Sequence, residues 1–147
     1  DLTLLVSSIQ VLPTEHGGEK WANFPRERSR LFQLLNEKLR QRLMILSGDR
    51  HYSEISRLDG VLSYPLYDFT SSSMTMDYPG KTVPNALRIG PVVPKASFGV
   101  IEIDWNEASP SVTLSMRSAA DSEVLFNTSV KLKKLERQIN GFFTEIY

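Results

Sequence analysis

The sequence predicts an α/β chain that alternates strand, helix and strand in its first half and is mostly antiparallel β in its second half. Residues 2–11 are nearly continuously apolar, which is typical of a strand covered on both faces. Residues 25–42 carry an apolar stripe with helical spacing, and residues 43–46 form a second apolar run. Alternating apolar and polar residues then predict an antiparallel meander, at 98–104, 112–116 and 124–130.

Composition excludes several classes of protein and of site. The 147 residues are enough for one domain with a buried core. Lys plus Arg and Asp plus Glu both total 17, so the zero net charge gives no support for nucleic-acid binding. The absence of cysteine excludes thiolate metal sites and disulfides from these residues. No apolar stretch is long enough to span a membrane, and no targeting segment is visible.

The predicted helix begins at Pro25, because proline fits the first helical turn, and extends to Arg42. Basic residues near its end suit the helix dipole. We expect Arg30 and Glu37 to be exposed and the apolar stripe to be buried against the sheet. That stripe consists of Leu31, Phe32, Leu35 and Leu39.

Shorter elements follow the second apolar run. Residues 54–58 are predicted to pair with residues 61–64 across the Asp59-Gly60 turn. Residues 66–70 are predicted to form another strand. Residues 77–94 contain several prolines and glycines and are predicted to be a long loop.

The most informative motif is Gly48-Asp49-Arg50-His51, directly after the apolar run at 43–46 and Ser47. A strand that ends in a glycine turn delivers its next side chains to the sheet edge where ligands bind in α/β proteins. In an extended chain Asp49 and His51 would point the same way, as half of a metal site. The alternative is that Asp49 caps a turn and His51 is an ordinary polar loop residue.

Five segments carry a more specific signal together than singly, at residues 13–28, 47–52, 64–73, 85–90 and 98–105. Taken together, they resemble the C-terminal half of an alkaline phosphatase D (PhoD-like) metallophosphoesterase, from about Leu4 to about Leu132. The family's earlier metal motifs, an Asp-rich set ending in an Asn-His-Asp type segment, do not occur in this sequence. We therefore expect a fragment or one piece of a longer protein, with residues 1–132 in the domain and residues 133–147 as a tail.

The resemblance implies a fold and an activity. The fold would be part of a four-layer αββα sandwich, in which two sheets are covered by helices. The activity would be metal-dependent hydrolysis of phosphate mono- or diesters by the full-length protein, as in calcineurin-like enzymes, with the isolated chain inactive. Two or more metal ions are implied, with calcium and iron favoured and zinc or manganese as alternatives.

The resemblance also implies roles for individual residues. Gly48-Asp49-Arg50-His51 matches the family's Gly-Asp-x-His variant of the superfamily's last ligand motif, so His51 would be a metal ligand in the catalytic centre. Asp49 would supply an oxygen where the superfamily has a nitrogen, which favours a harder ion. A histidine on the earlier loop binds the second metal in the superfamily, which would be His16. The alternative for His16 is a solvated loop residue.

Two more residues are candidates for contact with substrate. Asn23 lies in a segment that matches the family's Trp-x-Gly/Asn-aromatic pattern, and its amide could orient a metal-bound group. The alternative is that Trp21 and Phe24 of this segment only fix the helix entry. Arg50 could contact a phosphate through its guanidinium fork, or could be an ordinary surface arginine.

The implied partners are a phosphate ester and the missing N-terminal half of the same domain. A second class of function stays open, a non-catalytic β-rich interaction module that retains the family scaffold. Members of the family are often secreted or periplasmic, but nothing in these residues assigns a compartment.

Overall fold

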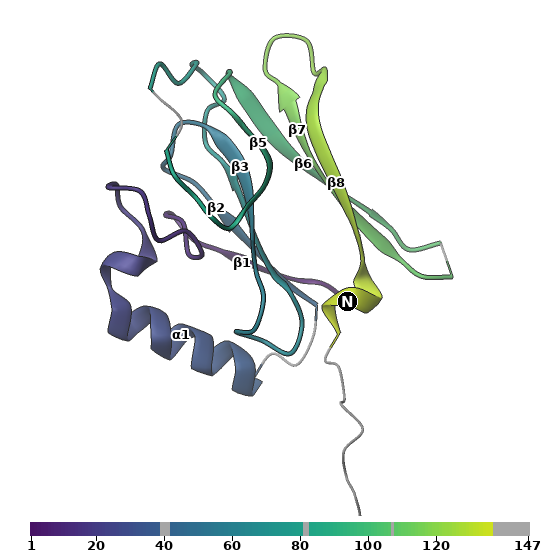
Figure 1. The fold of residues 1–147 in the computed structure, drawn as a ribbon. Helices are drawn as coiled ribbons and strands as arrows, with labels where there is room; N and C mark the ends of the chain where they lie inside the picture. Colours follow the sequence, from purple (N-terminus) through teal and green to yellow (C-terminus); the bar gives the residue numbers. More distant parts are fainter. Residues whose placement is uncertain (39–41, 81–82, 107, 137–147) are drawn as a thin grey trace, which may run out of the picture.

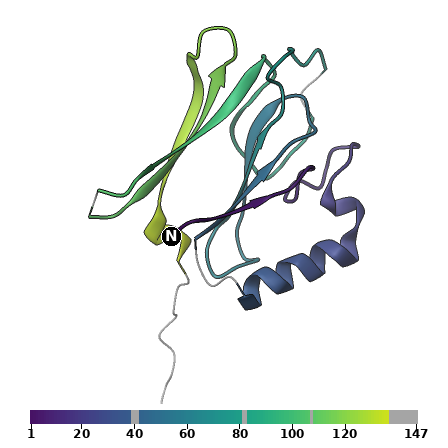
Figure 2. The same ribbon diagram turned by 180° about the vertical axis from the view of Figure 1, so that it is seen from behind.

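The computed structural model describes residues 1–38, 42–80, 83–106 and 108–136, and it has a mixed α/β fold dominated by strands. Helix α1 lies on one side of a five-stranded sheet, and a three-stranded sheet lies on the other side (Figures 1 and 2). No helix of the described part is long and apolar enough to cross a membrane. The elements of the larger sheet, with the helices that follow β1, are β1 (Thr3–Val6), η1 (Trp21–Asn23), α1 (Pro25–Lys38), β2 (Leu43–Ser47), β3 (Ser53–Leu58), β4 (Leu66–Ser71) and β5 (Arg88–Val93).

The larger sheet has the strand order β1-β2-β4-β3-β5. Strands β1, β2 and β4 are parallel, whereas β3 is antiparallel to both of its neighbours. The smaller sheet is the predicted meander, in the order β6-β7-β8, and a short helix η2 follows it. Its strands are β6 (Ser97–Asp104), β7 (Ser111–Ser118) and β8 (Val124–Lys131), and η2 spans Leu132–Leu135.

The strand predicted over residues 2–11 is too long, and it is not an inner strand in this structure. Only Thr3–Val6 pair in the sheet, at its edge, and three of these four residues are exposed. Beyond them the backbone N–H groups of Val11 and Leu12 donate to the carboxylate of Asp68, at 2.8 and 3.0 Å, rather than to a neighbouring strand. The chain therefore leaves the edge of the sheet after β1, and a side-chain acceptor holds the following loop over the sheet.

Two predictions for the middle of the chain are wrong. Strand β3 pairs with β4, so that Leu58 is opposite Leu66, and residues 61–64 form no strand. Leu62 and Tyr64 instead fold into the core. The predicted loop at 77–94 contains β5, which pairs with β3 across an irregularity between Ser53 and Ile55.

Helix α1 begins at Pro25 as predicted, and its described part ends at Lys38. Leu35 is 4% exposed, and Arg30 and Glu37 are exposed, as the stripe predicts, whereas Leu31 and Phe32 are only partly buried. Leu39 and Arg40 lie outside the described residues. Arg28 attaches the helix to the sheet-covering loop by donating to the carbonyl oxygens of Val11 and Leu12, at 2.8 and 2.9 Å.

The two sheets meet through reciprocal contacts between glycine and phenylalanine. A Cβ at Gly99 of β6 would lie 2.8 Å from the ring of Phe69 in β4. A Cβ at Gly90 of β5 would collide with the ring of Phe126 in β8. Each sheet therefore presents a bare backbone to an aromatic ring of the other, which allows close packing that any side chain would prevent.

We predict that Leu35→Ala lowers the free energy of unfolding by roughly 2–5 kcal/mol, because it removes a buried leucine from between helix and sheet. Leu34→Ala is the matched control, since Leu34 is 51% exposed and should change stability by no more than about 0.5 kcal/mol. Urea unfolding followed by circular dichroism measures both. Equal, small losses in the two variants would contradict the packing of α1.

Candidate functional site

The Gly48-Asp49-Arg50-His51 motif forms a turn at the carboxyl end of β2, between Ser47 and the start of β3 at Ser53. Contrary to the prediction, the segment does not have an extended backbone. Asp49 and His51 both have left-handed backbone angles, with φ of 67° and 58°. Such angles cost a non-glycine residue about 1–2 kcal/mol, so other contacts must hold the turn in place. Both side chains are exposed at its surface.

Ser72, which follows β4, attaches this turn to the neighbouring strand. Its Oγ accepts hydrogen bonds from the backbone N–H groups of Arg50 and His51, both at 3.0 Å. The hydroxyl itself lies 3.3 Å from the carbonyl oxygen of Tyr52, to which it donates. The turn is therefore fixed to the sheet through its backbone, and the side chains of Asp49 and His51 are left exposed.

His16 lies on the loop between β1 and η1 and is buried, with 3% of its surface exposed. Its Nδ1 accepts a hydrogen bond from the N–H of Gly18 at 3.2 Å, whereas its buried Nε2 has no partner in the described part of the chain. Burial, together with the positive charges of Arg50 and Lys20, lowers the pKa of His16 to about 4. The imidazole is therefore neutral at pH 7.

Arg50 brings the turn and this loop together. Its guanidinium lies so close to Gly18 that a Cβ at that position would collide with Nη1. Arg50 Nε donates to the hydroxyl of Tyr52 at 3.1 Å, and the guanidinium carbon lies 5.2 Å from the centre of that ring. On the loop itself, Lys20 Nζ donates to the carbonyl of His16 at 2.6 Å and to Asn23 Oδ1 at 2.7 Å. His16, Arg50 and Asn23 thus belong to one connected group.

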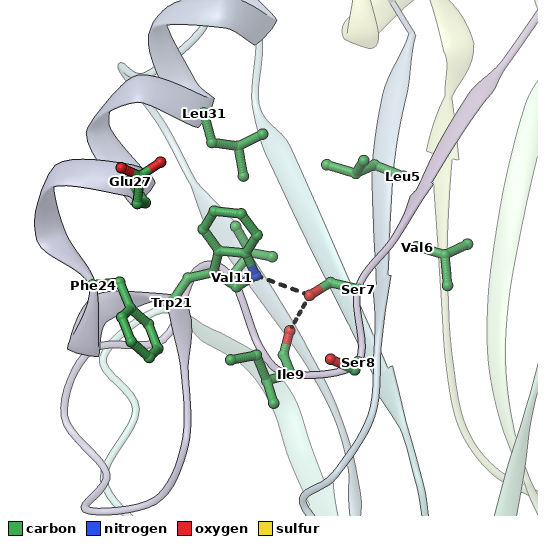
Figure 3. A pocket seen from close by; sticks show the side chains of 10 residues that line it. All are labelled: Leu5, Val6, Ser7, Ser8, Ile9, Val11, Trp21, Phe24, Glu27 and Leu31. Carbon is green, nitrogen blue, oxygen red and sulfur yellow. Dashed lines mark hydrogen bonds between the residues drawn. The ribbon is translucent and has the colours of Figure 1, made fainter.

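An apolar groove lies elsewhere, between β1 and α1, with a volume of about 510 Å³ (Figure 3). Its lining is mostly apolar, and Figure 3 shows Trp21 and Leu31 facing Leu5 across it. Trp21 Nε1 donates to Ser7 Oγ at 3.0 Å, which supports the interpretation that Trp21 fixes the helix entry. Phe24 at its rim is 58% exposed. None of Asp49, His51 or His16 lines this groove.

Beneath the site lies a row of buried polar side chains that the sequence analysis did not identify. Ser47, Thr70 and Glu54 are register partners across β2, β4 and β3. Ser47 Oγ lies 2.9 Å from Thr70 Oγ1 and donates to Asp68 Oδ1 at 2.6 Å. Gln10, from the covering loop, donates through Nε2 to Thr70 and Glu54 at 2.8 and 2.7 Å. Complete burial raises the pKa of Asp68, against the opposing effect of its hydrogen bonds.

Glu54 connects this row to the start of β5 and to the residues just before it. Arg88 Nε donates to Glu54 Oε2 at 2.6 Å, and Asn85 Nδ2 donates to Oε1 at 3.1 Å. The Glu54 side chain is fully buried and that of Arg88 is 15% exposed. Removing one partner of such a pair typically costs about 3–5 kcal/mol, since the other charge stays buried and unpaired. The only sequence signal for this row is a set of polar residues in otherwise apolar strands.

Comparisons with known proteins identify the fold. No family model and no curated protein matches the sequence. A solved structure described as "Structure of PhoD" matches with a TM-score of 0.61 and 13% sequence identity, over 95% of this chain and 33% of that one. The chain has a PhoD-like fold. At this identity the similarity establishes the fold alone, and the chain spans about a third of the length of the structure it matches.

Within this PhoD-like fold the described candidate ligands do not make up the complete ligand set of a metal ion. In residues 1–38, 42–80, 83–106 and 108–136, no three His, Asp or Glu side chains lie together as a metal-binding group. Glu15 is engaged elsewhere, because it accepts a hydrogen bond from the N–H of Ala86. The unpartnered Nε2 of His16 and the exposed Asp49 and His51 fit part of a ligand set, and further ligands would have to come from other residues.

We predict that the metal-free chain loses stability as pH falls from about 6.5 to 4, because unfolded His16 binds a proton in this range and folded His16 does not. Relative to His16→Asn, the wild type should lose roughly 1–3 kcal/mol more between pH 7 and pH 4. Asn can still accept the Gly18 hydrogen bond but does not titrate. Urea unfolding with a chelator measures the difference, and parallel pH profiles for the two proteins would contradict the prediction.

Proposed function

We propose that this chain is part of a PhoD-like phosphoric ester hydrolase, which uses metal ions to cleave phosphate mono- or diesters. The observation that carries the proposal is the Gly48–His51 turn. It lies at the carboxyl end of a parallel strand, where α/β proteins bind ligands, in a chain whose fold matches PhoD over 95% of its length. The residues of the turn are those that the sequence resemblance assigns to the metal site.

The proposal includes a four-layer sandwich completed by polypeptide beyond these residues. Strand β1 supports this, because Leu4 and Val6 are 41% and 75% exposed on an unpaired edge. Edge strands are usually protected by charge, proline or a bulge, and Thr3–Val6 contains no charged residue or proline. The partner would be the N-terminal half of the same domain, consistent with the 33% of the PhoD structure that this chain matches.

In the proposed enzyme His51 and Asp49 would hold a metal ion, and His16 would contribute a nitrogen to a second. Bound metal ions would lower the pKa of a water molecule and offset charge on the phosphoryl group. Neutral His16 has the charge state that metal binding requires. Binding through Nε2 would move its proton to Nδ1 and break the hydrogen bond from Gly18. Calcium and iron remain the favoured ions, with zinc and manganese as alternatives.

Arg50 and Asn23 are the proposed substrate contacts. Only Nε of the Arg50 guanidinium has a hydrogen-bond partner among the described residues, so Nη1 and Nη2 can face a phosphate oxygen. Asn23 is more constrained, because its Oδ1 accepts from Lys20 and its Nδ2 donates to the carbonyl of Gly18 at 3.3 Å. Its role would be to shape the loop beside the phosphate.

We predict that His51→Ala, in the complete polypeptide, lowers bound metal and phosphatase turnover together, the latter by at least about 100-fold. Arg30→Ala is the control, because Arg30 is an exposed residue of α1. Elemental analysis and a p-nitrophenyl phosphate assay are the measurements. Full metal content and normal turnover in His51→Ala would refute the assignment, and absence of both in the wild type would favour the non-catalytic module.

We also predict that residues 1–147 alone have no metal-dependent turnover comparable to that of the complete polypeptide. Two metal ions need about eight ligands between them at four- to six-fold coordination, and this chain has two histidines and no cysteine. The exposed edge of β1 should also make the isolated chain poorly soluble. Assays of a phosphate monoester and a diester with added calcium, iron or zinc test this, and full activity would show that the chain is sufficient.

A further inference from the structure

We infer that Ser72 is a positioning residue of the candidate metal site, which holds the Gly48–His51 turn in the conformation that presents Asp49 and His51. The inference rests on the proposed function, because the turn matters for catalysis only if it binds metal. Ser72 carries none of the chemistry itself. It acts through the backbone of the two residues that the turn must fix.

The hydroxyl of Ser72 uses its whole hydrogen-bonding capacity on this turn. A serine hydroxyl has two acceptor sites and one donor. The N–H groups of Arg50 and His51, at 3.0 Å each, occupy the acceptor sites, and the donor faces the carbonyl of Tyr52 at 3.3 Å. Three consecutive residues of the turn are thus bound to one oxygen atom.

The backbone of the turn needs such support. Asp49 and His51, with φ of 67° and 58°, lie in the left-handed region, which only a few per cent of non-glycine residues adopt, although Asp and His are among the commoner ones there. Residues strained in this way persist only where their surroundings fix them, and they concentrate at functional sites. The hydrogen bonds of Ser72 Oγ involve His51 and both of its neighbours, Arg50 and Tyr52. Their loss would therefore let the turn relax.

Ser72 is well placed for this because both of its neighbours are fixed. Ser71 is the last residue of β4 and pairs with Ser53 of β3. Ser73 forms a bridge to Ser97 of the smaller sheet, with a backbone hydrogen bond of 2.9 Å and a hydroxyl contact of 3.1 Å. The hydroxyl of Ser72 therefore extends from a rigid segment toward a strained one.

The test uses the complete polypeptide, with the metal that the wild type retains on purification identified by elemental analysis. Amide hydrogen exchange of Arg50 and His51 is measured in the metal-free protein, and metal affinity and kcat in the loaded protein. Ser72→Ala should accelerate exchange at both amides and weaken metal affinity by about 10–100-fold, the usual effect of losing a group that orients a ligand. Ser72→Thr should restore both properties.

Ser71→Ala is the matched control, since the Ser71 hydroxyl makes no hydrogen bond among the described residues and should affect neither measurement. If Ser72→Ala does not fold, Ser72→Thr and Ser72→Val give the same comparison, because they differ only in a hydroxyl against a methyl group. Unchanged exchange at Arg50 and His51, or faster exchange with unchanged metal affinity, overturns the inference and leaves the proposed function intact. A wild-type polypeptide that retains and binds no metal overturns both.

Discussion

Two carboxyl groups inside the chain, those of Asp68 and Glu54, are the constraint on which the rest of the structure depends. A buried carboxyl group is costly unless its oxygens are hydrogen-bonded. Asp68 satisfies this requirement by binding the backbone of Val11 and Leu12, which draws the first loop across the sheet. Glu54 satisfies it through Gln10, Asn85 and Arg88, which draws in the start of β5 and the residues just before it. Helix α1 then binds the first loop through Arg28.

The candidate site is built on this buried layer. Ser47 belongs to the layer and is the last residue of β2, so the turn that follows starts from a fixed point. His16 lies on the loop that Asp68 and Gln10 hold over the sheet, and the Arg50 guanidinium lies against that loop at Gly18. A rigid base therefore supports the polar groups that have no hydrogen-bond partner among the described residues. These groups are His16 Nε2 and the exposed side-chain ends of Asp49 and His51. Rigid elements are the better support for a site whose geometry must be accurate.

Much of the fold could be predicted because its signals are local. The stripe through Leu35 and the alternation in β6, β7 and β8 depend only on periodicity, and both were correct. Strand β5 was missed because Gly90 and Pro91 read as loop residues, although an edge strand tolerates them. The Asp59-Gly60 turn signal was overridden by the burial of Leu62 and Tyr64.

The motif of the candidate site could also be located, but its conformation could not be predicted. His51, one of the two residues with left-handed angles, is hydrogen-bonded to Ser72, which lies more than twenty residues away and becomes a neighbour only when β2 pairs with β4. The row formed by Ser47, Thr70 and Glu54 depends on the register of three strands in the same way. A single sequence contains no periodic signal for such pairings.

The contact of Gly99 with Phe69 connects the position of the smaller sheet to the conformation of the Gly48–His51 turn. A Cβ at Gly99 would also lie 3.1 Å from Cβ of Ser71, and β6 begins at Ser97, the bridge partner of Ser73. The meander is thus coupled to the residues on either side of Ser72, and any sliding of β6 along the larger sheet would be transmitted to the turn. The meander is therefore not an independent module that could be exchanged for another three-stranded sheet. Its sequence can vary only in ways that keep β6 in its present position.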